Sequence, residues 1–365
     1  MTSKPVVPVR HGGLVHDELA ELGISSASIL DFSVNVNPYG PCDEVRRAVS
    51  AAPIDRYPDP TAAPARRALG AWLGVAPGCL VVGNGAVDVL WSAARALLKP
   101  SDTVVIAEPA FSEMRVAAEL VGARVAEWRA APADHFAFHA RAFESVLHAE
   151  KPKLVYLATP ANPSGAGVGA PELLALAEAH PTIRFVFDVS FAGLGDRAPE
   201  FDLGRIARYG LENVVWVVSL TKELSVPGVR VGFGVGPVEW IREIQAQMPP
   251  WSVSAPAQAV AVIAAQDSVR RFVEMSRVRL SSDRQHLHRR LVGLGLAPCP
   301  SEAPYLLVHL GARTTGSSLR RALLERHGVL VRDAASFGLP DHIRLAARPE
   351  ADVERLIRAL EEEFP

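Results

Sequence analysis

The sequence predicts an α/β protein: a large domain with a mostly parallel seven-stranded sheet, followed by a smaller α+β domain. Short β-branched segments alternate with helical patterns through the middle of the chain. This alternation is typical of a parallel sheet covered by helices on both faces. After residue 255 a long helical pattern leads to a different arrangement of strands and helices. The chain has 365 residues, 49% of them hydrophobic, which is enough for one sizeable core and a smaller one.

The strands of the large domain are expected in short apolar runs. These are Leu80–Val82, Thr103–Ala107, Arg124–Trp128, Leu154–Thr159, Arg184–Asp188, Val214–Ser219 and Val231–Val235. Helices are expected between them at Val87–Leu98, Ser112–Val121, Pro171–His180 and Pro237–Gln247. In sheets of this kind the chemistry lies at the carboxyl ends of the strands. The residues that follow each strand are therefore the candidates for a site.

Three parts are expected along the chain. Residues 1–45 form an N-terminal arm that joins the small domain, residues 46–255 form the large domain, and residues 256–365 form the small domain with its connecting helix. The helical pattern of that last part runs from Ala255 to Leu294. Beyond it, strands are expected at Tyr305–Leu310, Val329–Arg332 and His342–Ala346, and helices at Ser317–His327 and Ala351–Phe364.

Charge and targeting signals exclude several classes of function. The net charge of −2 gives no basis for binding nucleic acid. The first residues lack the apolar core of a signal peptide, and no later apolar run reaches the length of a membrane span. Cys42, Cys79 and Cys299 lie too far apart in sequence for a metal-binding or redox pair. We expect a cytoplasmic protein that has no metal site and acts on a small molecule.

Lysine usage singles out one residue. Only five of the 38 basic residues are lysines, so arginine supplies most of the positive charge. Arginine cannot perform amine chemistry, and a lysine in an apolar neighbourhood is therefore a candidate for it. Lys222 alone directly follows a strand that is expected to be buried.

The surroundings of Lys222 are suited to a phosphate group. Ser219 and Thr221 precede it at the end of the strand, and Arg230 follows it by eight residues. Hydroxyls together with an arginine suit a phosphate monoester, and a partly desolvated site favours the neutral, nucleophilic amine. Gly83-Asn84-Gly85 adds a second candidate anion site between a strand and a helix. Taken alone, that segment would more often be an ordinary turn between a strand and a helix.

Two further strand ends carry a polar residue. Asp188 closes the strand Arg184–Asp188 with no cation beside it in sequence. Buried carboxylates need a partner, and both a pyridinium nitrogen and a role as helix N-cap remain open for Asp188. Asn162 lies in a loop between two prolines, where it could present its amide to a ring oxygen or simply form a turn.

Together these clusters, in this order, resemble the fold-type I enzymes that use pyridoxal 5′-phosphate (PLP), the aspartate aminotransferase superfamily. The most specific part is Ser219-x-Thr221-Lys222, followed by Pro227-Gly228-x-Arg230-x-Gly232, and the resemblance covers nearly the whole chain. It implies an aspartate-aminotransferase-like fold, PLP as the cofactor and Lys222 as the Schiff-base lysine. It also implies Asp188 on the pyridine nitrogen and Asn162 on the ring hydroxyl.

The resemblance implies further cofactor contacts and an assembly. The residues around the cofactor phosphate would be Gly85, Ala86, Ser219, Thr221 and Arg230. Phe111, in Glu108-Pro109-Ala110-Phe111, falls where the superfamily stacks an aromatic ring on the cofactor. Tyr57 falls where a tyrosine reaches the phosphate of the neighbouring subunit. A homodimer with shared sites is therefore implied.

Within the superfamily the chain most resembles threonine-phosphate decarboxylase, and histidinol-phosphate aminotransferase is the nearest sister. The segments that carry this likeness are His11-Gly12-Gly13, 30–38, 248–253 and 329–333. The likeness implies that Arg344 binds the substrate's α-carboxylate. It implies that His11, Asn35 and Arg332 lie near the substrate's distal phosphate.

Departures from the superfamily leave the substrate open. Asp188-Val189-Ser190-Phe191 stands where Asp-Glu-Ala-Tyr is usual, Ala86-Val87-Asp88 lacks a glutamate, and Pro249-Pro250 adds a proline to a loop expected over the active site. The leading expectation is a lyase that decarboxylates threonine O-phosphate or a related amino acid. The alternatives are an aminotransferase of the histidinol-phosphate type and a relative from secondary metabolism. The latter would decarboxylate or oxidatively deaminate another amino acid, for example a sulfur-bearing one. A PLP-sensing regulator would need a DNA-binding region, for which there is no room before His11.

Overall fold

The computed structural model describes residues 12–209 and 212–364, and the chain divides into two compact units. Unit 1 contains the described residues up to Asn35, Asp283–Cys299 and the described part of Tyr305–Pro365. Unit 2 contains the described residues of Val36–Ser282, together with Pro300–Pro304. These limits differ from the boundaries expected at residues 45 and 255. The reason is that residues 36–45 pack within unit 2, and that the helix Asp267–Gly293 contributes residues to both units.

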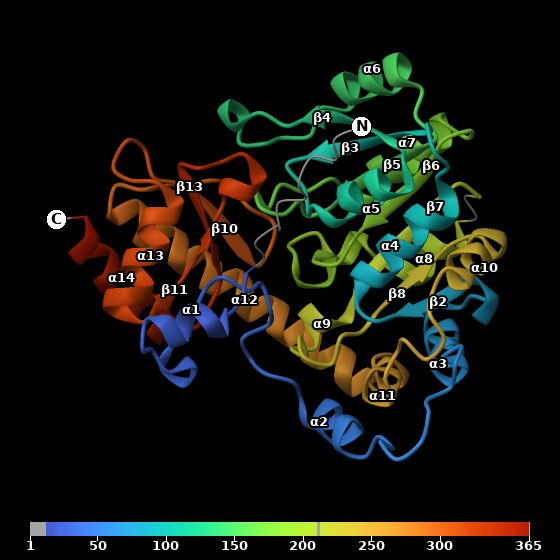
Figure 1. Cartoon of the computed structure of the whole chain (residues 1–365), viewed down its shortest axis with the longest axis horizontal. Coiled ribbons are helices and arrows are strands. Elements are labelled where there is room, and N and C mark those ends of the chain that lie inside the picture. Colours follow the sequence, from blue (N-terminus) through green and yellow to red (C-terminus); the bar gives the residue numbers. More distant parts are fainter. Residues whose placement is uncertain (1–11, 210–211, 365) are drawn as a thin grey trace. The chain divides into compact units, whose positions relative to one another are not determined.

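Unit 2 is built on a seven-stranded sheet, drawn in Figure 1 with its strands labelled. The strand order is β2-β8-β7-β6-β5-β3-β4. β8 runs antiparallel to both of its neighbours, and the other neighbouring pairs are parallel. The strands are β2 (Leu80–Gly83), β3 (Thr103–Glu108), β4 (Arg124–Arg129), β5 (Leu154–Ala158), β6 (Arg184–Asp188), β7 (Val214–Ser219) and β8 (Gly232–Val235). The predicted mostly parallel, seven-stranded sheet is confirmed.

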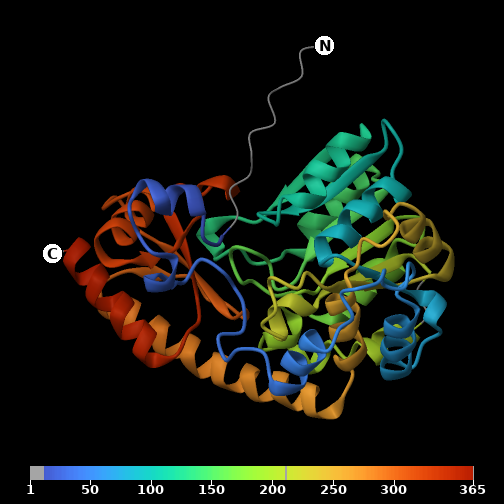
Figure 2. The same ribbon diagram turned by 60° about the horizontal axis from the view of Figure 1, so that its bottom comes forward.

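Helices cover both faces of this sheet, as Figures 1 and 2 show. The helices of unit 2 are α2 (Asp43–Ser50), α3 (Ala63–Leu73), α4 (Ala86–Leu97), α5 (Glu113–Val121), α6 (Ala140–Glu150), α7 (Ala170–Ala179), α8 (Leu203–Arg208), α9 (Leu220–Glu223), α10 (Val238–Ala246), α11 (Ala255–Ile263) and the first part of α12 (Asp267–Gly293). All six residues of β7 are buried, because helices shield the strand from both sides.

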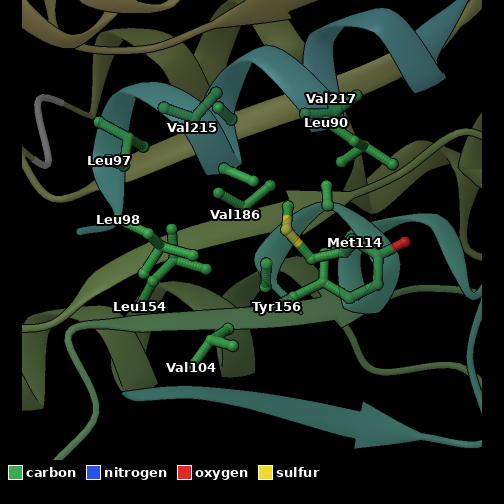
Figure 3. Packing of buried hydrophobic residues seen from close by; sticks show 14 of the residues in the cluster. Leu90, Leu97, Leu98, Val104, Met114, Leu154, Tyr156, Val186, Val215 and Val217 are labelled. Atoms are coloured by element: carbon green, nitrogen blue, oxygen red, sulfur yellow. The ribbon is translucent and has the colours of Figure 1, made fainter. Parts of the chain in front are cut away.

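The main core of unit 2 lies between one face of the sheet and helices α4, α5 and α10. Figure 3 shows part of it, with Val104, Leu154, Val186 and Val215 from the strands and Leu90 from α4. These side chains alternate along their strands, so one face of each strand supplies the cluster. This packing fixes where each strand ends, and it thereby positions the residues that follow the strands.

Unit 1 has a smaller α+β architecture. A four-stranded sheet of order β12-β13-β10-β9 is antiparallel, and β1 pairs with β11 in parallel. The elements are α1 (His16–Glu21), β1 (Leu30–Asp31), β9 (Ala297–Pro298), β10 (Tyr305–His309), α13 (Gly316–His327), β11 (Val329–Leu330), β12 (Arg332–Asp333), β13 (His342–Ala346), α14 (Glu350–Glu363) and the second part of α12. Apolar residues of β10 and β13 pack with those of α12, α13 and α14 to form its core.

Two sequence predictions of elements were wrong in detail. The single helix expected over 255–294 is two helices, α11 and α12, which break before Asp267. Asp and Ser favour helix N-termini over interiors, and Asp267 and Ser268 begin the second helix. In place of the single strand expected at Val329–Arg332 there are two short strands that belong to different sheets: β11 pairs with β1, and β12 pairs with β13. Over the part of the chain that the structure describes, no helix is long and apolar enough to cross a membrane.

Candidate active site

The carboxyl edge of the sheet in unit 2 gathers most of the predicted cofactor residues. β2, β3, β5, β6 and β7 end at this edge, and the antiparallel β8 begins there. The residues on these strand ends and on the segments beside them are Gly85, Ala86, Phe111, Asn162, Asp188, Ser219, Thr221, Lys222 and Arg230. Positions far apart in sequence meet here because parallel strands share one carboxyl edge.

Lys222 lies on the short helix α9, directly after β7. Its ammonium nitrogen is 5.9 Å from the centroid of the Phe191 ring, within the range of a cation–π contact. Its backbone carbonyl accepts a hydrogen bond from the N–H of Asn37 at 3.0 Å. The side-chain Nδ2 of Asn37 donates to the carbonyl of Glu223, also at 3.0 Å. Asn37 is buried, and its two hydrogen bonds fix the backbone carbonyls of Lys222 and of the residue that follows it.

An ion pair with a residue of α12 also holds the helix α9. Glu223, the neighbour of Lys222, receives hydrogen bonds from both terminal nitrogens of Arg270 on α12, at 2.8 and 3.3 Å. The guanidinium of Arg270 also lies 4.7 Å from the ring centroid of Trp72. Burial lowers the pKa of Arg270, but the charge of Glu223 and the hydrogen bonding to it together outweigh burial and hold that pKa above its usual value. The sequence alone did not show this pair, because its members lie 47 residues apart.

Asp188 ends β6 with both carboxylate oxygens engaged. Oδ2 accepts a hydrogen bond from the hydroxyl of Tyr156 at 3.1 Å, and Oδ1 accepts one from the N–H of Ser190 at 3.0 Å. Burial raises the pKa of Asp188, while these donors and the positive charge of Lys222 oppose the rise. The helix N-cap role does not apply, since no helix starts at Asp188. The carboxylate of Asp188 and the amine of Lys222 thus interact electrostatically, and both residues belong to unit 2.

Hydroxyls, glycines and a guanidinium meet at the start of α4. The hydroxyls of Ser219 and Thr221 are 2.6 Å apart and buried. Gly85 has φ +83°, and a Cβ at this position would lie 2.9 Å from a terminal nitrogen of Arg230. A Cβ on Gly232 would lie 2.5 Å from the backbone nitrogen of Ala86, so both glycines permit close approach. The arrangement combines a helix N-terminus with hydroxyls and a guanidinium, which suits a phosphate.

Asn162 and Phe111 lie in loops that are fixed by hydrogen bonds. In the Asn162 loop, the hydroxyl of Thr159 donates to the carbonyl of Val168 at 2.9 Å and accepts from the N–H of Val168 at 2.8 Å. Before Phe111, Glu108 accepts a hydrogen bond from the N–H of Ala110 at 2.8 Å. Both predicted residues are therefore presented at the carboxyl edge by short, constrained segments.

These residues fit PLP. A buried carboxylate suits the pyridinium nitrogen, the hydroxyls with Arg230 and the α4 N-terminus suit the phosphate, and Lys222 supplies the amine for the aldehyde. Tyr156 and Asn37 belong to this arrangement but were missed from the sequence. Tyr156 lies in an apolar run that looks like ordinary core, and Asn37 precedes a proline as in a common turn. Neither residue carries a signal in sequence that points to its partner.

Unit 1 brings two predicted substrate residues side by side. Arg332 on β12 lies directly opposite Arg344 on β13, and both side chains are 5% exposed. A terminal nitrogen of Arg344 donates to the carbonyl of Ser33 at 2.6 Å, and its guanidinium lies 5.5 Å from the ring centroid of Tyr305. Burial, together with the charge of Arg332, lowers the pKa of Arg344 to about 10. Arg332 donates to the hydroxyl of Ser336 at 2.6 Å and lies 3.6 Å from Asp333.

Asn35, Tyr57 and His11 complete the predicted set. Asn35 is 4% exposed, and neither atom of its side-chain amide has a hydrogen-bond partner among residues 12–209 and 212–364. Tyr57, in unit 2, is 80% exposed, and its ring lies 4.9 Å from that of Trp251. His11 lies outside the described residues. The roles expected for these side chains stay predictions.

Comparison with known proteins agrees with this geometry. The family described as "Aminotransferase class I and II" matches residues 27–360. A histidinol-phosphate aminotransferase of Symbiobacterium thermophilum is 33% identical over 360 residues, covering 98% of this chain and 95% of its own. Histidinol-phosphate aminotransferase 2 of Ralstonia nicotianae is 30% identical, also covering 98% and 95%.

Solved structures share the fold. Histidinol-phosphate aminotransferase of Sinorhizobium meliloti in complex with PLP has a TM-score of 0.84 at 24% identity, covering 99% of this chain and 95% of its own. The L-threonine-O-3-phosphate decarboxylase of Porphyromonas gingivalis has a TM-score of 0.79 at 25% identity, covering 91% and 98%. The aspartate-aminotransferase-like fold and PLP as cofactor are thereby confirmed. The chain belongs to the family of class I and II aminotransferases, which are PLP-dependent enzymes.

Proposed function

We propose that this enzyme is an aminotransferase of the histidinol-phosphate type, which acts on a small amine that carries an anionic group. The observation that carries the proposal is the buried pair Arg332–Arg344 in unit 1. Two buried positive charges side by side are costly; Asp333, 3.6 Å from Arg332, offsets part of that cost, and a bound anion would offset more of the desolvation and the repulsion. The names of the relatives support the transfer reaction over the decarboxylation that the sequence led us to expect first.

The residues have distinct roles in this proposal. PLP, when bound, acts as the electron sink for charge that develops at the substrate's α-carbon. Lys222 would hold the cofactor and move the proton at the α-carbon, and Asp188 would hold the proton of the pyridine nitrogen. Asn162 would donate to the ring hydroxyl, and Phe111 would pack on the ring. The residues that would bind the cofactor phosphate are Gly85, Ala86, Ser219, Thr221 and Arg230.

On the substrate side, a planar guanidinium can make two parallel hydrogen bonds to a carboxylate or phosphate. We assign this role to Arg344. Histidinol phosphate carries one anionic group, so Arg332, Asn35 and His11 would bind the second, distal anionic group of the dicarboxylate that exchanges the amino group, such as 2-oxoglutarate. The side-chain amide of Asn35 is buried and has no partner within the described ranges, so a ligand oxygen would satisfy it.

A homodimer belongs to the same proposal. Tyr57 is exposed in the single chain, and its ring lies 4.9 Å from the exposed ring of Trp251; Ile54, three residues earlier in sequence, is also exposed. An exposed aromatic pair of this kind suits burial against a second copy of the chain. There Tyr57 would reach the cofactor phosphate of the partner.

One observation favours a second candidate, the decarboxylation of threonine O-phosphate. Two adjacent guanidiniums match a substrate that carries a carboxylate and a phosphate together, and threonine O-phosphate carries both. The solved decarboxylase of Porphyromonas gingivalis shares the fold. The two reactions differ in which bond at the α-carbon is broken, and therefore in the orientation of the bound substrate.

The test uses the purified, PLP-loaded enzyme with four compounds: histidinol phosphate, threonine O-phosphate and their unphosphorylated counterparts. 2-Oxoglutarate is added as amino acceptor, and glutamate and carbon dioxide are measured separately. Glutamate formed from histidinol phosphate, but not from histidinol, is the expected result. Carbon dioxide from threonine O-phosphate would instead establish the second candidate. Equal rates with and without phosphate would overturn the assignment of an anionic substrate.

A further inference from the structure

A buried tyrosine lies behind the carboxylate of Asp188. Tyr156 on β5 is paired with Val186 on β6 in parallel register, and Asp188 lies two residues further along β6. Because side chains alternate between the two faces of a strand, Tyr156 and Asp188 point to the same face. The hydroxyl of Tyr156 donates to Oδ2 of Asp188 at 3.1 Å. Figure 3 shows its ring among the apolar side chains of the core, with Met114 beside it and the hydroxyl as its oxygen atom.

The hydroxyl of Tyr156 is a permanent donor. Its side chain is fully buried, and burial together with the charge of Asp188 raises its pKa well above the usual value. It therefore keeps its proton throughout the range in which enzymes work. The second oxygen of Asp188 is held by the N–H of Ser190, so the carboxylate cannot rotate without losing a hydrogen bond on each side.

We propose that Tyr156 is a positioning residue for the cofactor's pyridine nitrogen, because its hydroxyl keeps the Asp188 carboxylate oriented and ionised. The inference rests on the proposed role of Asp188. A carboxylate that holds a pyridinium must stay charged although it is buried, and burial favours the neutral acid. A donor to the charged form opposes that tendency. Tyr156 supplies such a donor from the side of the core.

A plainer explanation is that Asp188 merely satisfies a buried hydroxyl. Buried tyrosine hydroxyls do need a partner. The two explanations differ in what they predict for the proton at the pyridine nitrogen. If Tyr156 only needs a partner, its removal leaves that proton in place. If Tyr156 keeps Asp188 ionised, its removal makes the carboxylate more basic and draws the proton from the ring nitrogen toward Asp188.

The test follows this proton directly in the holoenzyme. The protein is loaded with PLP that carries ¹⁵N in the pyridine ring, and the ¹⁵N resonance is recorded between pH 6 and 9 for wild type, Tyr156→Phe and Asp188→Asn. We expect the wild-type resonance at the position of the protonated ring. Asp188→Asn should give the position of the unprotonated ring, and Tyr156→Phe should lie between the two. The PLP dissociation constant of Tyr156→Phe should rise about tenfold, the value of one hydrogen bond to a charged group.

A second variant, with 3-fluorotyrosine at position 156, should have the opposite effect on the proton at the ring nitrogen. 3-Fluorotyrosine placed at position 156 is a stronger hydrogen-bond donor than tyrosine, so this variant should keep the resonance at the protonated position up to a higher pH than wild type. This variant keeps the size of the ring and guards against a packing defect in Tyr156→Phe. Tyr209→Phe is the matched control, because Tyr209 is exposed, and its spectrum should equal that of wild type.

The outcomes separate the two claims. If Asp188→Asn leaves the resonance unchanged, the role of Asp188 fails, and the inference about Tyr156 fails with it. If Asp188→Asn shifts the resonance but Tyr156→Phe does not, Asp188 keeps its role and Tyr156 has none. Loss of the ring proton at a lower pH in Tyr156→Phe and at a higher pH in the fluorotyrosine variant, each relative to wild type, establishes Tyr156 as the positioning residue.

Discussion

Arg344 is a buried, charged side chain whose surroundings hold it in place and favour the binding of an anion. Its guanidinium lies between the ring of Tyr305, the carbonyl of Ser33 and the strand that carries Arg332. Its pKa falls to about 10, first because of burial and then because of the charge of Arg332. It therefore stays charged at neutral pH, but at a cost that a bound anion would offset.

The substitution Arg344→Lys tests whether Arg344 binds the anionic group of the substrate. Lysine keeps the charge but loses the planar pair of donors, so the KM for the amino substrate should rise by about tenfold or more, equivalent to about 1.4 kcal/mol. The absorption spectrum of the bound cofactor should not change, since Arg344 is assigned to the substrate and is not among the residues expected to contact the cofactor. Steady-state kinetics with each compound of the panel provide the measurement.

Arg321→Lys is the control for this substitution. Arg321 is also in unit 1, but its side chain is 73% exposed and pairs with Glu325 on the same helix. Its kinetics should match wild type. An unchanged KM in Arg344→Lys would move the binding site for the substrate's anionic group to another residue.

At the scale of elements, an aspartate links two strands of unit 1 through histidines. Asp341, just before β13, contacts Nδ1 of His342 at 2.7 Å and Nε2 of His309 on β10 at 3.1 Å. His309 and His342 are also register partners, with ring centroids 4.8 Å apart. Burial lowers the pKa of His342 below 6.5, and His309 adds to this, although Asp341 opposes it.

The stability of the protein should therefore depend on pH through His342. A histidine whose pKa is lower in the folded state binds its proton more readily in the unfolded chain. Its contribution is complete above pH 6.5 and is lost as the pH falls from there through the lowered pKa, with a slope of at most about 1.4 kcal/mol per pH unit. Urea unfolding between pH 5 and 7.5 measures this slope.

His342→Asn should flatten the slope in this range, because asparagine does not titrate but can still contact Asp341. His16→Asn is the control, since His16 is exposed at the start of α1. If His342→Asn keeps the wild-type slope, another group causes the pH dependence.

At the scale of the whole molecule, the proposed dimer predicts that active sites are shared. Lys222→Ala and Tyr57→Ala should each be strongly impaired as pure proteins. In a mixed dimer, one site would contain both damaged residues, and the other site would contain an intact Lys222 and an intact Tyr57. Co-expression of the two variants with different tags, followed by isolation of the hybrid, should recover up to about half of the wild-type activity.

The hybrid experiment also tests the alternative. If each chain used its own Tyr57, both sites of the hybrid would carry one substitution, and activity would stay at or below that of pure Tyr57→Ala. Sedimentation of the wild-type protein provides the necessary control, because a monomer would contradict the dimer at once.

The sequence by itself determined the parts of this protein that depend on local pattern. Buried parallel strands appear as continuous apolar runs, so their positions, and with them Lys222, Asp188 and Arg230 at one edge of the sheet, could be predicted. The cofactor followed from the same motif. The break between α11 and α12 has a local signal in Asp267 and Ser268, which was overlooked. The division into two strands around Val331 could not be predicted, because it depends on what each segment pairs with.

Only the tertiary structure decided the partners of the polar residues. Tyr156 lies in an apolar run that looks like ordinary core, and only the register of β5 against β6 brings its hydroxyl to Asp188. Arg332 and Arg344 become neighbours only when β12 and β13 pair, and Asn37 reaches Lys222 across 185 residues of chain. Hydrogen-bond partners depend on how distant segments align in the folded chain, and the residue pattern of a single segment does not determine that alignment.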